Sequence, residues 1–111
     1  MITRFAMFEG TVADENITAF RAAVHERLVP LWTQFPGNVD VRVMFSDDRD
    51  EGAPEYPLIL AITYKDEAGM VSALDSPYRA QSRDVTGEIV AQYFTGKIHH
   101  HVTELNLFPA P

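Results

Sequence analysis

The chain contains no cysteine, so it can form no disulfide, no thiolate nucleophile and no thiolate metal site. It has no run of about 18 apolar residues, the length that a membrane-spanning helix needs. Its start, MITRFAMFEG, has no basic region followed by a long apolar stretch, as a targeting segment would have. We therefore expect a cytoplasmic protein with no membrane segment.

Basic residues are also scarce. Nine Lys and Arg stand against sixteen Asp and Glu, which gives a net charge of -7. A chain of this charge repels the phosphates of nucleic acids and the headgroups of anionic lipids. Neither nucleic acid nor a membrane surface is therefore an expected partner.

Several signatures of cofactor and metal sites are missing. The chain has no glycine-rich phosphate loop, no dinucleotide fingerprint and no serine-nucleophile motif. Its acidic segment 46–57 fails as a calcium-binding EF-hand, because Ile59 stands where that loop needs a glutamate. We expect no cofactor and no bound metal.

What is present is the composition of an ordinary folded protein. The chain has 111 residues, of which 46% are hydrophobic and 23% are charged. A chain of this length buries roughly two thirds of its unfolded surface, which is enough for one hydrophobic core. We therefore expect a single domain spanning residues 1–111.

Hydrophobic periodicity predicts alternating strands and helices. The predicted strands are 3–9, 39–45, 58–64 and 97–105, and the predicted helices are 14–35, 66–74 and 77–93. The first helix carries an apolar stripe made of Ile17, Phe20, Val24, Leu28, Leu31 and Phe35. Pro30 falls opposite this stripe and predicts a bend rather than a break. Asp14, Asp66 and Ser76 are the expected N-caps of the three helices.

This order of elements predicts an α+β, ferredoxin-like βαββαβ sandwich with a four-stranded antiparallel sheet covered by helices on one face. The residues expected to face the helices are Val39, Val41, Val43, Phe45, Leu58, Leu60, Ile62, Ile98 and Val102. Those expected on the opposite, open face are Arg42, Met44, Ile59, Ala61, Thr63, His99 and His101. In the first strand either Arg4, Ala6 and Phe8 or Phe5 and Met7 could face the helices. A half-apolar open face predicts a homodimer, with a pocket between the sheet and the partner.

Several segments resemble the EthD-type family. The segment AFRAAVHERLVPLWTQFPG resembles its first helix, with the pair Phe20-Arg21, His25, Leu28 and the terminal Pro36-Gly37. The later ALDSP, followed by Asp84 and a histidine-containing last strand, is also similar. One departure is the stretch Ala22 to Val24, where EthD-type proteins commonly carry an aromatic residue. The resemblance covers nearly the whole chain and implies a dimeric α+β barrel. The family is named for a protein encoded with an ether-degrading oxygenase system, and its relatives include polyketide dehydratases and decarboxylases.

The histidines are the candidate catalytic residues, because imidazole exchanges protons near neutral pH. Strand alternation sends His99 and His101 to the open face and His100 toward the helices. His25 shares a flank of the first helix with Arg21 and Trp32. The proposed catalytic residues are His25, His99 and His101, and the proposed substrate-binding residues are Arg21, Trp32, Arg42, Met44 and Thr63.

Each of these residues also has a plainer interpretation. His25 can be a hydrogen-bonded histidine at the edge of the core, and His99 and His101 can bridge a dimer interface. Arg42 can form an intersubunit ion pair with Asp40. His100 can be a half-buried packing residue that donates to Tyr64 or Tyr78.

Three functions remain open on this basis. The first is a small homodimer that binds a compact apolar or aromatic molecule, with histidine-based proton transfer of the dehydratase, decarboxylase or isomerase type. It would act in a catabolic or biosynthetic pathway, as an enzyme or as an accessory to an oxygenase system. The second is a noncatalytic hydrophobe-binding or stress-related dimer. The third is a cofactor-free monooxygenase or haem-handling protein on the same scaffold.

Overall fold

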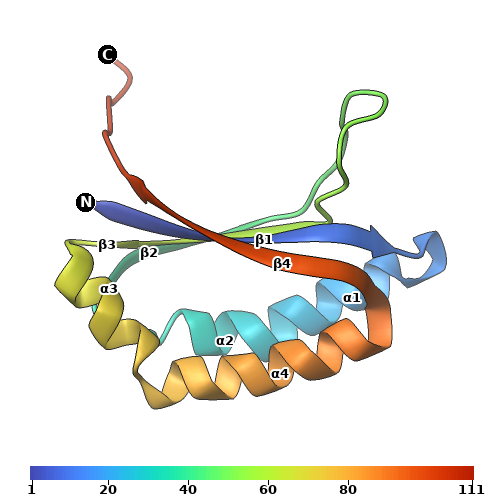
Figure 1. Ribbon diagram of the computed structural model, residues 1–111, viewed down its shortest axis with the longest axis horizontal. Helices are drawn as coiled ribbons and strands as arrows, with labels where there is room; N and C mark the ends of the chain where they lie inside the picture. Colours follow the sequence, from blue (N-terminus) through green and yellow to red (C-terminus); the bar gives the residue numbers. More distant parts are fainter.

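The computed structural model describes residues 1–111 and has two layers, with one antiparallel sheet covered by helices on a single face (Figure 1). The strands are β1 (Ile2–Val12), β2 (Asn38–Met44), β3 (Leu58–Tyr64) and β4 (Phe94–Glu104), in the spatial order β2-β3-β1-β4. The helical elements are the 3-10 turn η1 (Asp14–Asn16), α1 (Ile17–Ala23), the π-helical turn η2 (Val24–Leu28), α2 (Val29–Trp32), α3 (Glu67–Leu74) and α4 (Pro77–Tyr93). The predicted ferredoxin-like sandwich is confirmed. None of the helices is both long and apolar enough to cross a lipid bilayer.

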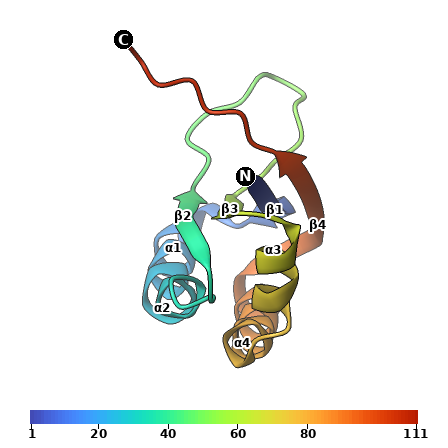
Figure 2. The same ribbon diagram turned by 90° about the vertical axis from the view of Figure 1, so that its left-hand side faces the viewer.

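The face of the sheet opposite the helices has no helix over it. Both the segment between β2 and β3 and the tail after β4 extend on that side (Figure 2). The tail starts from a hydrogen bond between the Leu105 amide and the Met1 carbonyl, at 2.9 Å. We keep the name open face for this side of the sheet.

The structure decides which side of β1 faces the helices. Ala6 pairs with Leu60 and Phe8 pairs with Leu58, and all four side chains are buried in the core under the helices. Arg4 has the same parity, so it also lies on the helical side. Phe5 and Met7 consequently belong to the open face.

The first helix is continuous but contains a wide turn before Pro30. The Val29 amide donates to the Val24 carbonyl, five residues earlier, and α-helix resumes directly afterwards. Proline has no N–H and its ring crowds the carbonyl four residues before it, so a π-helical turn is a way of keeping the chain helical. The expectation that Pro30 does not break the helix is therefore confirmed.

The wide turn changes which residues form the buried stripe. Phe20, Val24, Leu28 and Trp32 follow at steps of four and are all buried, whereas Leu31, expected in the stripe, is only half-buried. One extra residue in a turn rotates everything after it by about 100° around the helix axis. Trp32 therefore points into the core.

Two of the three predicted N-caps are present. The Asp66 side chain accepts from the Gly69 amide at 2.8 Å and the Ser76 side chain accepts from the Arg79 amide at 3.3 Å. Asp14 was expected to cap the first helix, which is wrong. It lies inside the preceding 3-10 turn, and its side chain makes no capping hydrogen bond.

Two residues predicted to face the helices are exposed. Asn38 pairs with Tyr64 but Asp40 pairs with Thr63, so Val39 is an extra residue in a bulge and is 53% exposed. Val102 has the predicted parity, but it lies on the edge strand β4, where the helices leave it exposed.

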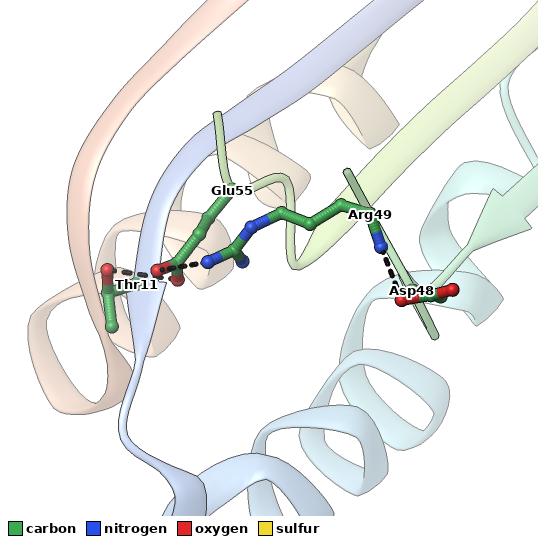
Figure 3. A network of polar contacts seen from close by, with 4 residues as sticks. All are labelled: Thr11, Asp48, Arg49 and Glu55. Carbon is green, nitrogen blue, oxygen red and sulfur yellow. Dashed lines mark hydrogen bonds and ion pairs between the residues drawn. The ribbon is translucent and has the colours of Figure 1, made fainter. Parts of the chain in front are cut away.

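The acidic segment between β2 and β3 is anchored to β1 through Glu55 (Figure 3). The Glu55 carbonyl accepts from the Gly10 amide at 3.0 Å, and its carboxylate accepts from the Thr11 hydroxyl at 3.2 Å. Arg49 donates to the same carboxylate at 3.1 Å, and its amide donates to Asp48 at 2.9 Å. The second half of this segment is therefore held against the end of the strand.

Gly10 and Gly96 face each other where the backbones of β1 and β4 lie close together. A Cβ on Gly10 would lie 2.2 Å from the Thr95 carbonyl oxygen, and one on Gly96 would lie 2.2 Å from the Glu9 carbonyl oxygen. The Phe94 ring packs over both glycines and meets Phe8 edge-on, with centroids 5.7 Å apart. β1 and β4 can therefore stay paired through this region only if both positions are glycine.

Gly10→Ala or Gly96→Ala should lower the free energy of unfolding by about 2–4 kcal/mol, because the new methyl group meets a backbone carbonyl that cannot move aside cheaply. Gly87→Ala is the matched control. It adds the same methyl group to α4 with nothing within 4 Å, and should stabilise the protein by about 1 kcal/mol. Urea unfolding of the three variants measures the difference, and equal stabilities would contradict the close approach.

Candidate functional site

The three consecutive histidines of β4 lie on alternate faces of the sheet. His99 and His101 pair with Met7 and Phe5 on the open face, whereas His100 pairs with Ala6 on the helical face. The strand register therefore agrees with the faces that the sequence predicted for the three histidines. The triplet therefore contributes imidazoles to two separate environments.

On the open face, His99 lies beside a carboxylate but forms no hydrogen bond with it. Its Nε2 lies 3.2 Å from Oε1 of Glu9, and the Tyr56 hydroxyl donates to the same oxygen at 3.5 Å. His101 is exposed and makes no side-chain hydrogen bond within the chain. His99 and His101 thus share a face but not a partner.

His25 and Arg21 lie together, at the beginning of the segment after β2. The His25 ring meets the Phe45 ring edge-on, with centroids 5.4 Å apart, and the Arg21 guanidinium lies 5.1 Å from the same ring. Arg21 also donates to the Ser46 carbonyl at 3.0 Å and lies 3.8 Å from the Asp47 carboxylate. This pair holds the start of the acidic segment in place.

Trp32 was expected beside His25 and Arg21, and this expectation is wrong. His25 is exposed, whereas Trp32 is only 3% exposed and lies in the core. The reason is the π-helical turn between them, which rotates Trp32 out of the flank that a regular helix would give it.

The remaining predicted binding residues lie on the open face, but apart from one another. Arg42 lies 3.4 Å from Asp40 of its own chain, and an intersubunit pair between these two residues stays a prediction. Met44 is 39% exposed, whereas Thr63 is buried and its hydroxyl lies 2.8 Å from that of Thr3. None of the three main cavities of the chain is lined by Arg42, Met44 or Thr63.

The main apolar cavity lies on the other side of the sheet, between the strands and the helices α2 and α4. Its volume is about 430 Å³, within the usual range of small-molecule sites. Its lining residues are Arg4, Ala6, Phe8, Trp32, Phe35, Leu60, Ile62, Tyr64, Arg79, Ser82, Arg83, Thr86, Gly87, Val90, Ile98 and His100. We call this space the helix–sheet cavity.

Burial distinguishes the floor of the helix–sheet cavity from its mouth. The floor is largely buried and aromatic, with Trp32, Phe35 and Tyr64 among its members. Arg83 and His100 are exposed, so they mark the mouth between α4 and the edge strand β4. An apolar floor with polar groups gathered at the entrance is the arrangement typical of a ligand site.

The polar groups of this cavity perturb one another. Partial burial by the cavity walls lowers the pKa of His100, and the positive charges of Arg4, Arg79 and Arg83 lower it further. Burial raises the pKa of Tyr64, although Arg4 and Arg79 act in the opposite direction. His100 is therefore a neutral imidazole at neutral pH, able to accept a proton.

The hydrogen bonds considered for His100 are not formed. Its ring is accessible at the mouth, only partly buried by the cavity walls, and it makes no side-chain hydrogen bond to Tyr64 or Tyr78. Its partner across the sheet is Ala6, whose small side chain leaves the space beside the imidazole open.

The sequence reasoning missed the arginines of this cavity. Arg79, Arg83, Thr86 and Val90 follow at steps of three or four along α4, so helical spacing places them on one stripe. That stripe was a signal available from the sequence. It was overlooked because charged residues on a helix usually face solvent. No three histidine, aspartate or glutamate side chains of the structure gather closely enough to hold a metal ion.

No protein-family model matches the chain, and curated proteins give no match in sequence. Solved structures do match. An ethyl tert-butyl ether d (EthD) family protein from Bacillus halodurans C-125 superposes with a TM-score of 0.71 at 18% identity, covering 96% of this chain and 99% of that one.

Two further structures are similar over nearly their whole length. One is a dimeric protein of unknown function with a ferredoxin-like fold from Bacteroides fragilis, with a TM-score of 0.65, 12% identity and coverage of 94% of this chain and 95% of that one. The other is a mutant of SnoaB, a cofactor-independent oxygenase from Streptomyces nogalater, with a TM-score of 0.64, 15% identity and coverage of 96% and 94%. Identities this low establish the fold alone. The chain has the ferredoxin-like fold of EthD-type and related proteins, and the resemblance predicted from its sequence is confirmed at that level.

Proposed function

We propose that this protein binds a compact apolar or aromatic molecule in the helix–sheet cavity and transfers a proton through His100. The observation that carries the proposal is a cavity of about 430 Å³ with an aromatic floor and a neutral imidazole at its mouth. An apolar pocket that orients a ligand toward one base is the arrangement that dehydration, decarboxylation and isomerisation require.

His100 suits the role of general base better than the other histidines. It lies at the edge of a largely apolar cavity, and its lowered pKa favours the unprotonated form. His99 lies beside Glu9 on the open face, and His25 is exposed against Phe45. A catalytic role for His25, His99 or His101 stays a prediction, which the same set of variants tests.

A homodimer is part of the proposal. The open face carries the half-buried side chains of Phe5, Met7 and Ile59 beside the exposed Met44, and no helix of the chain covers them. The similar structure from Bacteroides fragilis is described as dimeric. A second copy placed on this face would bury these apolar groups and enclose His99 and His101 between the two sheets.

A cofactor-free oxygenase is a second candidate. It is favoured by the similarity to SnoaB and by Trp32 in the cavity floor, against which an aromatic substrate would lie. Oxygen uptake that requires both the substrate and His100 would support it. A haem-handling role stays a prediction, and a Soret shift on adding haem measures it.

Deuterium exchange into β-tetralone tests the proton transfer, because this aromatic ketone has an acidic C–H beside its carbonyl and a size suited to the cavity. His100→Ala should slow the protein-catalysed exchange by about a hundredfold or more, the usual contribution of a positioned base. His25→Ala, His99→Ala and His101→Ala should leave the rate unchanged.

Two other outcomes have clear meanings. Loss of exchange in His99→Ala or His101→Ala alone would move the site to the open face. If the parent protein binds β-tetralone but neither it nor any variant catalyses the exchange, the noncatalytic hydrophobe-binding dimer would be favoured.

Gly87 offers a way to close the cavity without disturbing the fold. It lines the mouth, and a side chain built there meets nothing within 4 Å. Gly87→Leu should preserve or raise the melting temperature, because leucine is the better helix former, yet abolish ligand binding by filling the entrance. Trp32 is the single tryptophan of the chain, so its fluorescence reports binding directly. Unchanged binding in Gly87→Leu would place the ligand elsewhere.

The lowered pKa of His100 also predicts a pH dependence of stability. At pH values between the lowered pKa of His100 in the folded protein and its value of 6.5 in the unfolded chain, the unfolded chain binds a proton that the folded chain does not. Stability therefore falls as the pH drops through this window, and no such loss occurs above it. Urea unfolding of the parent protein and of His100→Gln across this range isolates the effect. The parent should lose more stability than the variant, and parallel curves would contradict the lowered pKa.

A further inference from the structure

The helix–sheet cavity is positively charged although the protein as a whole is acidic. Arg4 comes from β1, and Arg79 and Arg83 come from successive turns of α4. None of the sixteen residues that line the cavity is an aspartate or glutamate. Three cations therefore surround one space with no anion of the protein among them.

The other arginines of the chain are all paired with carboxylates. Arg21 lies 3.8 Å from Asp47, Arg42 lies 3.4 Å from Asp40, and Arg49 lies 3.1 Å from Glu55. Arg27 is paired with Glu88. The chain has sixteen acidic residues, so carboxylates are not scarce. The three cavity arginines nevertheless have no carboxylate partner.

The three cavity arginines also have few other contacts. Arg4 and Arg83 make no side-chain hydrogen bond within the chain, and Arg79 donates once, to the Leu74 carbonyl at 3.4 Å. Burial and the charge of Arg79 lower the pKa of Arg4, which means that the two cations repel each other in a partly desolvated space. Such an arrangement works against the stability of the empty protein and is relieved by an anion.

We infer that the ligand of the helix–sheet cavity carries an oxyanion, a carboxylate or an ionised enol, which Arg79 and Arg83 bind at the mouth together with Arg4. Its apolar or aromatic body lies on the floor against Trp32 and Phe35. The guanidinium group matches a carboxylate with two parallel hydrogen bonds, and such charged bonds are among the strongest in proteins. The inference rests on the proposed function, because it concerns the same cavity, and it adds the charge class of the ligand.

The same charges fit the proposed chemistry. When His100 removes a proton from a carbon beside a carbonyl, the carbonyl oxygen gains negative charge as the enolate forms. Arginines already in place around that oxygen stabilise the charge without reorganisation. A carboxylate ligand and an enolate intermediate therefore call for the same three cations.

Two probes of matched shape test the charge preference. They are para-tert-butylbenzoate and the neutral para-tert-butylbenzyl alcohol, each titrated against Trp32 fluorescence. The parent protein should bind the carboxylate at least about tenfold more tightly than the alcohol. Arg79→Gln and Arg83→Gln should each remove most of this preference while leaving the affinity for the alcohol unchanged.

Arg49→Gln is the matched control, because it removes the same charge from the segment between β2 and β3, outside the cavity. It should keep the preference for the carboxylate. Thermal unfolding of each variant verifies that it is folded. The double variant Arg79→Glu/Arg83→Glu should reverse the preference and favour para-tert-butylbenzylamine, a gain of binding that a damaged protein would not show.

Equal binding of the carboxylate and the alcohol by the parent, or a preference that survives both arginine substitutions, would overturn the inference and leave the proposed function standing. No response of Trp32 to either probe would overturn both. A preference lost equally in Arg49→Gln would show a general effect of net charge and would also overturn the inference.

Discussion

The antiparallel pairing of β1 with β4 is the constraint on which the rest of the structure depends. It sets Ala6 opposite His100 under the helices, and Met7 opposite His99 on the open face. Because side chains alternate along a strand, shifting this register by one residue would exchange the two faces and empty the helix–sheet cavity of its imidazole. The glycine pair at positions 10 and 96 lets the same two strands stay in register beyond the cavity.

The electrostatics of the molecule follow from where its carboxylates lie. The acidic groups of the segment between β2 and β3 pair with Arg21 and Arg49, at the opposite end of the first helix from the cavity. On the open face, Glu9 lies beside His99 and Asp40 pairs with Arg42. On the helical side, Glu88 of α4 pairs with Arg27, and no carboxylate lines the helix–sheet cavity. An overall negative protein therefore contains one cationic cavity.

Much of the fold could be predicted from the sequence, because periodicity and caps are local signals. Strand alternation gave the faces of His99, His100 and His101, and Asp66 and Ser76 mark the beginnings of their helices. The orientation of β1 could not be decided, because both of its faces are half apolar and the choice depends on its neighbours across the sheet.

The candidate site was less accessible to sequence reasoning. Regular helical spacing assigned Trp32 to the same flank as His25. The π-helical turn before Pro30 rotates the residues after it, and the apolar spacing of the sequence does not reveal such a turn. Arg79 and Arg83 have the spacing of one stripe, but only the packed structure brings Arg4 to the same space. The sequence therefore predicted the open face as the site, whereas the apolar cavity of the chain lies on the helical face.

A crystal structure of the protein with para-tert-butylbenzoate is the most direct measurement of the central claim. The account predicts one ligand per chain inside the helix–sheet cavity, its ring against Trp32 and its carboxylate toward Arg79 and Arg83. Ligand bound instead on the open face beside His99, with the cavity empty, would contradict it.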